Sequence, residues 1–238
     1  MRRFFGNVKN DIAVLDGDEF THLRTVLRAK EGDKVIIYDQ SEMEYVCEII
    51  EISKTQAKCR VLSSKICEGL PKKNIVLFQA LTKREAYELS LQKAVELGVA
   101  KMIPFTSDFT NVKSTENKRE RLEKLVLSAC KQCERSVPMQ IGETLSFNSL
   151  LEEVKEFSSL ESNVVLFANE RAGAKFDFTS LREKKNIAII VGAEGGFSQK
   201  EKEELEKLST SISLGKRILR NETASIVLCG ITSILGDN

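Results

Sequence analysis

Two glycine-rich segments near the C-terminus hold the residue types best suited to binding a ligand. The segment Gly192-Ala193-Glu194-Gly195-Gly196 follows an apolar run, and the segment Leu214–Ala224 follows a short stretch of β-forming residues. Glycine lacks a Cβ atom, so backbone N–H and C=O groups can approach a ligand closely there. Ligands of α/β proteins gather outside the carboxyl ends of strands. The spacing predicts a ligand site built from both segments, although glycine clusters are also common in plain turns.

The chain after residue 73 alternates between apolar strands and helices. The expected strands are Asn74–Ala80, Val99–Phe105, Val164–Ala168, Ile187–Val191 and Ser211–Leu214. The expected helices are Arg84–Leu97, Lys118–Glu134, Phe147–Phe157, Lys200–Leu208 and Ser225–Leu235, the last of them buried. Ser198 and Glu201 have the spacing of a helix capping box. This alternation predicts an α/β fold with a mostly parallel sheet and helices on both faces.

The beginning of the chain has a different pattern. Its expected strands are Ile12–Leu15, Lys34–Tyr38, Met43–Ile50 and Ala57–Leu62, and the segment Glu19–Lys30 has a helical rhythm. Many short strands with one helix predict a small β-barrel. The proline in Leu70-Pro71-Lys72-Lys73 marks the change of pattern, so we expect one domain at 1–70 and a second at 71–238.

The composition is that of an ordinary soluble globular protein. The chain has 238 residues, of which 42% are hydrophobic and 30% charged. A formal net charge of +1 does not by itself indicate a nucleic-acid-binding protein, so any RNA contact must come from local patches. We find neither a signal peptide nor a segment long and apolar enough to span a bilayer, and we expect a cytoplasmic protein.

The cysteines do not indicate a metal site. Cys130 and Cys133 form a C-x-x-C pair without a second pair, and the single histidine, His22, is far away in sequence. A thioredoxin-like pair would begin a helix, whereas these two residues come late in an expected helix. We therefore expect reduced core thiols and no metal.

The glycine segments also carry a resemblance to a known family. Val191–Ser198 and Leu214–Ala224 resemble the paired signatures of the RsmE family of 16S ribosomal RNA uridine-N3 methyltransferases, which belongs to the SPOUT superfamily. Further stretches similar to that family are Met1–Phe5, His22–Arg28, Gln92–Val99 and Ala129–Arg135.

The chain also departs from the family pattern. Ala193 stands where a proline is common, and Ser128 and Cys133 stand where a glutamate and a serine are more usual. The segment Asp108–Lys113 replaces a serine- and arginine-bearing pattern, so we expect no role there beyond a possible RNA contact.

The resemblance implies a complete mechanism and architecture. The first domain would be a PUA-like, RNA-binding β-barrel, and the second a SPOUT domain with a C-terminal trefoil knot. The enzyme would use S-adenosyl-L-methionine to methylate N3 of a specific uridine in 16S ribosomal RNA, with that RNA as its substrate either free or within the small ribosomal subunit. It would act as a homodimer with the cofactor loops at the interface.

The resemblance and the residue types together suggest site residues. Arg220 would stabilise the negative charge that develops as uracil loses its N3 proton, and Glu194 would act as a base or simply order its loop. The expected cofactor-binding residues are Leu166, Phe167, Gly192, Gly195, Gly196, Leu214, Gly215, Ile218, Leu219 and Thr223. The expected RNA-binding residues are Arg2, Arg3, Arg24, Arg28, Lys93, Gln132 and Arg135. For the cations among them, a solvated surface or an ion pair is the plainer alternative.

Two other functions fit parts of the sequence. A non-catalytic RNA-binding or ribosome-assembly protein would need only the barrel and the basic patches. A nucleotide-binding oxidoreductase would use Gly192–Gly196, but the G-x-G-x-x-G spacing is missing.

Overall fold

The computed structural model describes residues 1–112, 119–172 and 176–237 in two compact units. The first unit comprises Met1–Leu70 and Leu127–Pro138, and the second comprises Pro71–Val126 and Met139–Asn238. One division falls at the expected boundary after Leu70. The segment Leu127–Pro138, which the sequence placed in the second domain, is grouped with the first unit instead.

The first unit is built on a six-stranded sheet. Its strands are β1 (Arg2–Phe5), β2 (Asn7–Lys9), β3 (Ile12–Leu15), β4 (Lys34–Tyr38), β5 (Met43–Ile52) and β6 (Ala57–Ile66), in the order β1-β4-β5-β6-β3-β2. The two edge strands, β1 and β2, follow one another in the chain through Gly6. A Cβ atom on Gly6 would lie 2.7 Å from Leu15 Cδ2 and 2.7 Å from Val14 O, so glycine is needed where the sheet curls back on itself.

One face of this sheet is covered by a short helical segment. Helix α1 (Gly17–Thr21) continues into a π-helical turn, η1 (His22–Val26), and buries Phe20 and Leu23 against the sheet. The helical segment ends before Lys30, where the sequence placed its end, because Arg28 adopts a left-handed conformation with φ 51°. A curled sheet with one helical segment agrees with the expected barrel-like unit.

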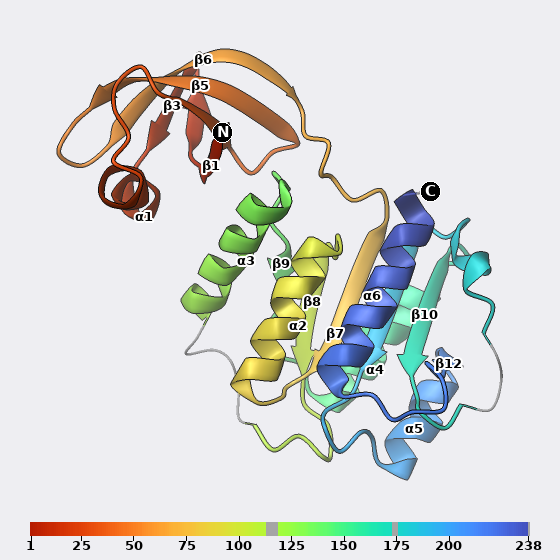
Figure 1. Cartoon of the computed structure of the whole chain (residues 1–238). Helices are drawn as coiled ribbons and strands as arrows, with labels where there is room; N and C mark the ends of the chain where they lie inside the picture. Colours follow the sequence, from red (N-terminus) through yellow and green to blue (C-terminus); the bar gives the residue numbers. More distant parts are fainter. Residues whose placement is uncertain (113–118, 173–175, 238) are drawn as a thin grey trace. The chain divides into compact units, whose positions relative to one another are not determined.

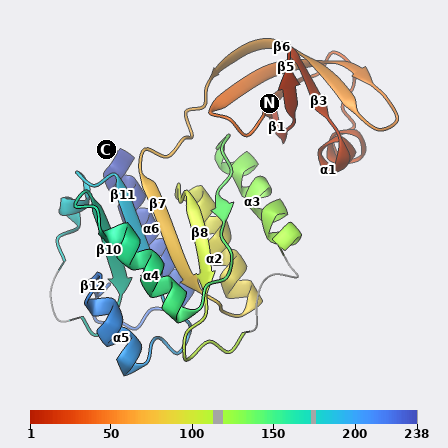
Figure 2. The same cartoon turned by 180° about the vertical axis from the view of Figure 1, so that it is seen from behind.

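The second unit contains a parallel six-stranded sheet. Its strands are β7 (Asn74–Ala80), β8 (Lys101–Phe105), β9 (Gln140–Ile141), β10 (Asn163–Ala168), β11 (Asn186–Val191) and β12 (Thr210–Ile212), in the order β12-β10-β11-β7-β8-β9. The helices are α2 (Arg84–Glu96), α3 (Arg119–Cys133), α4 (Phe147–Ser158), η3 (Phe178–Leu181), α5 (Gln199–Glu206) and α6 (Asn221–Asp237). Helices α2 and α6 cover one face of the sheet and α4 covers the other (Figures 1 and 2). This confirms the expected α/β fold.

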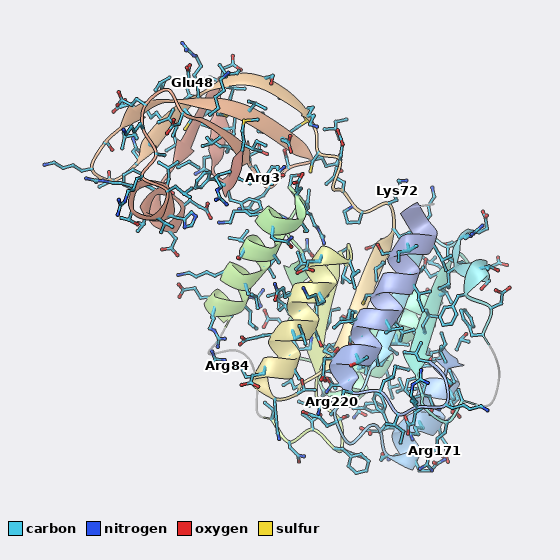
Figure 3. All side chains as sticks on the ribbon, in the orientation of Figure 1. Arg3, Glu48, Lys72, Arg84, Arg171 and Arg220 are labelled. Carbon is cyan, nitrogen blue, oxygen red and sulfur yellow. The ribbon has the colours of Figure 1, made fainter. Side chains whose placement is uncertain are left out.

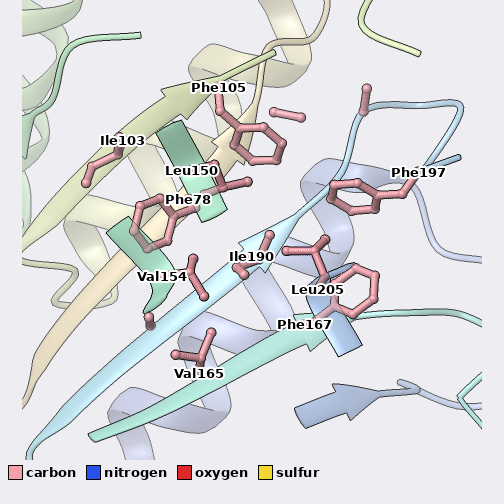
Figure 4. Close-up of a cluster of buried hydrophobic side chains, with 13 residues drawn as sticks. Phe78, Ile103, Phe105, Leu150, Val154, Val165, Phe167, Ile190, Phe197 and Leu205 are labelled. Atoms are coloured by element: carbon pink, nitrogen blue, oxygen red, sulfur yellow. The ribbon is translucent and has the colours of Figure 1, made fainter. Parts of the chain in front are cut away.

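The strands bury both faces, as parallel strands do. On the α4 side, alternate strand residues such as Phe78, Phe105, Phe167 and Ile190 form one apolar cluster with Leu150 (Figure 4). The residues between them, including Leu77 and Ile189, are fully buried on the opposite face. Because side chains alternate along a strand, a run that is apolar throughout can serve two cores.

Helix α6 differs from the expected buried helix. It begins at Asn221 rather than Ser225, and Ile234 is 59% exposed, so only one side of the helix is buried. The buried side carries Leu228, Cys229 and Thr232. Within the described ranges, we find no helix with the length and apolar character needed to cross a membrane.

The connection from β12 to α6 positions the candidate site. Strand β12 pairs with β10 at the sheet edge, whereas α6 packs on β7 and β11. The segment 213–220 must therefore run past the carboxyl ends of β10 and β11. The trefoil knot implied by the resemblance would require this segment to thread through a neighbouring loop, and it stays an expectation.

Candidate active site

A pocket of about 920 Å³ lies at the carboxyl ends of β7, β10, β11 and β12. It is lined by the loop after β7, by Ala168–Glu170 after β10, by Gly192–Phe197 after β11, and by much of Leu214–Ala224. The chain leaves β7 toward β8 on one side but leaves the neighbouring strand β11 toward β12 on the other side, so the connections reverse direction here. Such a switch point is where open α/β sheets bind ligands.

The first glycine segment is shaped by a buried aromatic ring. Phe197 is 5% exposed and lies between Phe105 and Phe167, with ring centroids 6.0 and 5.2 Å away. A Cβ on Gly192 would lie 2.7 Å from the Phe197 ring, so only glycine allows this close packing. Gly196 has φ 71° and its N–H donates to Ala193 O at 2.9 Å, which closes a tight turn.

A buried carboxylate connects this segment to the loop after β8. Glu201 is 4% exposed; its Oε2 accepts the Ser198 N–H at 2.9 Å and its Oε1 accepts the Asp108 N–H at 2.9 Å. Ser198 Oγ accepts the Glu201 N–H at 3.4 Å and donates to Asp108 Oδ2 at 2.6 Å. The predicted capping box is thus confirmed, and it also holds a neighbouring loop.

The second glycine segment is more exposed. Gly215 has φ 113°, a conformation that side chains other than glycine rarely adopt, and its N–H donates to Ser213 Oγ at 3.4 Å. Ile218 lines the pocket and is 85% exposed. A large apolar side chain left in solvent at a pocket edge is suited to covering a bound ligand.

Arg220 and Glu194 both line the pocket. The Arg220 side chain lies just before the first residue of α6 (Figure 3) and is 87% exposed. Its Nη1 lies 3.9 Å from Glu222 Oε1. An ion pair this long and this solvated holds the guanidinium weakly, so it stays available to a substrate. Glu194 Oε1 accepts the Lys83 N–H at 3.4 Å, which supports a part in ordering the loop.

The pocket has charges of both signs. Its charged lining residues in the described chain are Lys83, Arg217 and Arg220 together with Glu85, Glu170, Glu194 and Glu222. This mixture suits a ligand that itself carries both signs of charge better than it suits a polyanion.

The expected cofactor residues fall into two groups. Those that line the pocket are Gly192, Gly195, Gly196, Leu214, Gly215, Ile218 and Leu219. Leu166 and Phe167 do not line it, because they are fully buried in β10, and the lining begins one residue later at Ala168. Thr223 is exposed on the first turn of α6 and also lies outside the lining.

Some lining residues are not among those predicted from the sequence. Lys83 and Glu85 follow β7, and Asn169 follows β10; Asn169 is 6% exposed and its N–H donates to Ile212 O at 2.9 Å. Asn221, at the start of α6, is 7% exposed. For Lys83, Glu85 and Asn169, the available signal was a position within five residues of the end of a buried strand.

Several expected RNA-binding residues of the first unit are exposed. Arg2, Arg24, Arg28 and Gln132 are exposed, and Arg24 lies over the Phe20 ring with its Cζ 6.0 Å from the centroid. Arg24 Nη1 also donates to Lys54 O at 3.3 Å. These side chains can reach a phosphate without breaking a buried contact.

Other expected RNA-binding residues are engaged within the protein. Arg3 Nη2 lies 2.6 Å from Glu134 Oε2, and Lys93 Nζ lies 2.9 Å from Glu96 Oε1. Arg135 is 3% exposed and its Nε donates to Val137 O at 2.7 Å; burial lowers the pKa of this guanidinium. The burial of Arg135 argues against a direct phosphate contact and favours a structural role.

Comparison with known proteins defines the class of this fold and pocket. A sequence model described as an RNA methyltransferase domain matches residues 69–233, and one described as an RNA methyltransferase PUA domain matches residues 15–62. The pocket and both glycine segments lie within the first match. The class is therefore that of the RNA methyltransferases.

Similar proteins of known name identify one family within the RNA methyltransferases. Ribosomal RNA small subunit methyltransferase E of Mesomycoplasma hyopneumoniae is 34% identical over 233 residues, covering 96% of this chain and 97% of that protein. This chain belongs to the family of ribosomal RNA small subunit methyltransferase E.

Solved structures share the fold. A probable rRNA-methyltransferase from Porphyromonas gingivalis is 25% identical, with a TM-score of 0.84 and coverage of 100% of this chain and 99% of that one. A ribosomal RNA small subunit methyltransferase E from Neisseria gonorrhoeae, described as bound to S-adenosyl methionine, is 23% identical with a TM-score of 0.84, covering 99% of this chain and 98% of that one.

Proposed function

We propose that this protein uses S-adenosyl-L-methionine to methylate N3 of a uridine in 16S ribosomal RNA. The observation that carries the proposal is the pocket at the carboxyl ends of β11 and β12, which both glycine segments line. Membership of the methyltransferase E family supports ribosomal RNA of the small subunit as the substrate. The uridine N3 position comes from the family resemblance.

The residues present fit the cofactor. The pocket volume of about 920 Å³ lies in the range usual for cofactor sites, roughly 300–1,000 Å³. S-adenosyl-L-methionine carries a carboxylate, an ammonium and a sulfonium, which matches the mixed charges of the lining. Backbone groups of Gly192, Gly195, Leu214, Gly215 and Leu219 would hold it. When bound, the cofactor supplies an electrophilic methyl group, and the protein has to bind and orient it.

At the acceptor base, one proton has to be removed and the negative charge that develops has to be stabilised. Uracil N3 carries a hydrogen that has to leave, so the attacking base becomes anion-like. Arg220, whose guanidinium is exposed, would stabilise this charge. Glu194 either accepts the proton or orders the loop through its contact with the Lys83 N–H.

The first unit would contribute RNA binding as a PUA-like domain. Arg2, Arg24 and Arg28 are exposed cations on this unit, and guanidinium groups match phosphate oxygens. Gln132 is exposed as well and can both donate and accept hydrogen bonds. Lys93 would contact RNA from the second unit after giving up its ion pair with Glu96.

A homodimer is part of the proposal. Helices α2 and α6 pack side by side, and each leaves an apolar side chain in solvent, Leu89 at 40% and Ile234 at 59% exposure. A second copy could bury these side chains and bring the cofactor loops to the interface. Sedimentation equilibrium of the purified protein tests this, and a monomer at micromolar concentration would contradict it.

Mass mapping of methylated nucleosides tests the function directly. Ribosomal RNA from cells with and without the protein is digested, and the fragment masses are compared. We expect one N3-methyluridine in 16S ribosomal RNA that disappears without the protein. Binding of radiolabelled S-adenosyl-L-methionine separates this enzyme from a non-catalytic ribosome-assembly protein, which would not bind it.

A further inference from the structure

Phe109 is an aromatic ring left in solvent near the pocket. It is 46% exposed, and it is the one aromatic residue among the large apolar side chains exposed in the described part of the chain. It lies in the loop after β8, where the chain departs from the pattern of the family it resembles. An aromatic ring that is accessible beside a pocket offers a face on which a planar ligand can stack.

The loop holds this ring in a defined turn. The Thr110 N–H donates to Ser107 O at 2.9 Å, and the Ser107 N–H donates to Thr110 Oγ1 at 2.8 Å. Between them, Asp108 is bound on both sides by the capping box, through Glu201 Oε1 at 2.9 Å and Ser198 Oγ at 2.6 Å. The backbone before Phe109 is therefore fixed to the start of α5, and the residue after it is tied back to Ser107.

The same turn packs the Cβ end of the Phe109 side chain against the first glycine segment. A Cβ atom on Gly195 would lie 3.0 Å from Phe109 Cβ and 3.4 Å from Phe109 Cγ. Gly195 lines the pocket. Phe109 thus stands beside the pocket wall, outside the lining, with its ring accessible from solvent.

We propose that the Phe109 ring is a stacking platform for an unpaired RNA base that enters the pocket. The inference rests on the proposed function, which requires a single-stranded pyrimidine to reach a pocket-bound methyl donor. Proteins that select unpaired bases stack them on aromatic faces, and a rigidly held ring orients the base at little entropic cost. Phe109 is then a positioning residue for the acceptor base, with no part in proton transfer.

Steady-state methyl transfer by Phe109 variants tests the proposal. The substrate is small ribosomal subunits from cells lacking the protein, with tritiated S-adenosyl-L-methionine as donor. Phe109→Leu keeps an apolar side chain but removes the aromatic face, and we expect kcat/KM for the subunits to fall about 5- to 150-fold. Phe109→Tyr keeps the face and should stay within about threefold of the wild type. Leu160→Ala, at a 59% exposed apolar residue of the same unit, is the matched control.

Cofactor affinity separates stacking from simple support of the loop. By titration calorimetry, Phe109→Leu should bind S-adenosyl-L-methionine as tightly as the wild type. The inference is overturned if Phe109→Leu methylates at the wild-type rate, or if its cofactor affinity falls by the same factor as kcat/KM. If instead the proposed function is wrong, the wild-type protein itself will transfer no methyl group to the subunits, so the two failures give different results.

Discussion

The Ser225 hydroxyl donates a hydrogen bond to the Gln79 side-chain oxygen, from helix α6 across to strand β7. Both side chains are buried, at 1% and 0% exposure, and they are 146 residues apart in sequence. Because the pocket loops leave β7 and enter α6 close to this contact, it holds two walls of the pocket together.

Ser225→Ala should destabilise the protein. It leaves the Gln79 oxygen buried without this donor, at a cost of about 1–3 kcal/mol in the free energy of unfolding. Urea unfolding followed by circular dichroism measures the change. Ser128→Ala, at an exposed serine of α3, is the control and should change stability by less than about 0.5 kcal/mol. Equal stability of the two variants would contradict the role of the buried contact.

Arg220→Ala should remove methyl transfer and leave cofactor binding intact. Loss of a group that stabilises developing negative charge typically lowers kcat about 100-fold or more. The side chain is 87% exposed, so its removal should not disturb the fold. Arg171→Ala, at an exposed arginine outside the pocket lining, should transfer methyl groups normally. Wild-type kcat in Arg220→Ala would assign the charge stabilisation to another residue.

Glu201→Ala should loosen the first glycine segment. The substitution removes the acceptor of the Ser198 and Asp108 N–H groups, and loss of a helix cap and a buried acceptor costs about 1–3 kcal/mol. We expect lower stability in urea together with weaker binding of S-adenosyl-L-methionine by calorimetry. Glu203→Ala, at an exposed glutamate of the same helix, should change neither quantity. Unchanged cofactor affinity in Glu201→Ala would show that the capping box does not shape the pocket.

Stability should fall at alkaline pH through the buried thiols. Burial raises the pKa of Cys59 to about 11 and that of Cys47 to about 12, above the ordinary value of 9.0. Below pH 9 the thiols are neutral in both states, so their contribution is fully present. Above it the unfolded thiols ionise while the folded ones do not, and each subtracts up to about 1.4 kcal/mol per pH unit.

Cys59→Ala isolates this effect. Between pH 9 and 11, its unfolding free energy should fall less steeply with pH than that of the wild type, by up to about 1.4 kcal/mol per pH unit. Urea unfolding at several pH values gives both slopes. Parallel slopes would mean that Cys59 ionises equally easily in the folded protein.

The sequence by itself determined the local features of the site. The apolar run ending at Val191, the Ser198–Glu201 capping box and the strand Asn74–Ala80 follow from hydrogen-bonding and packing patterns within a few residues. The glycines at 192 and 215 likewise mark positions that resist other residues, Gly192 because a Cβ would meet the Phe197 ring and Gly215 because of its φ of 113°. The order of these elements was enough to place both segments at strand ends, and the structure puts both on one pocket.

Only the tertiary structure decided which residues those elements bring together. Strand β9 is only two residues long and is stabilised by pairing with β8. No local sequence pattern therefore predicts it. Phe167 and Ala168 differ by one position, yet one is fully buried and the other lines the pocket. Arg135 reads as a surface cation in the sequence but is buried in the first unit. Burial depends on partners far away along the chain, and a local pattern contains no information about those partners.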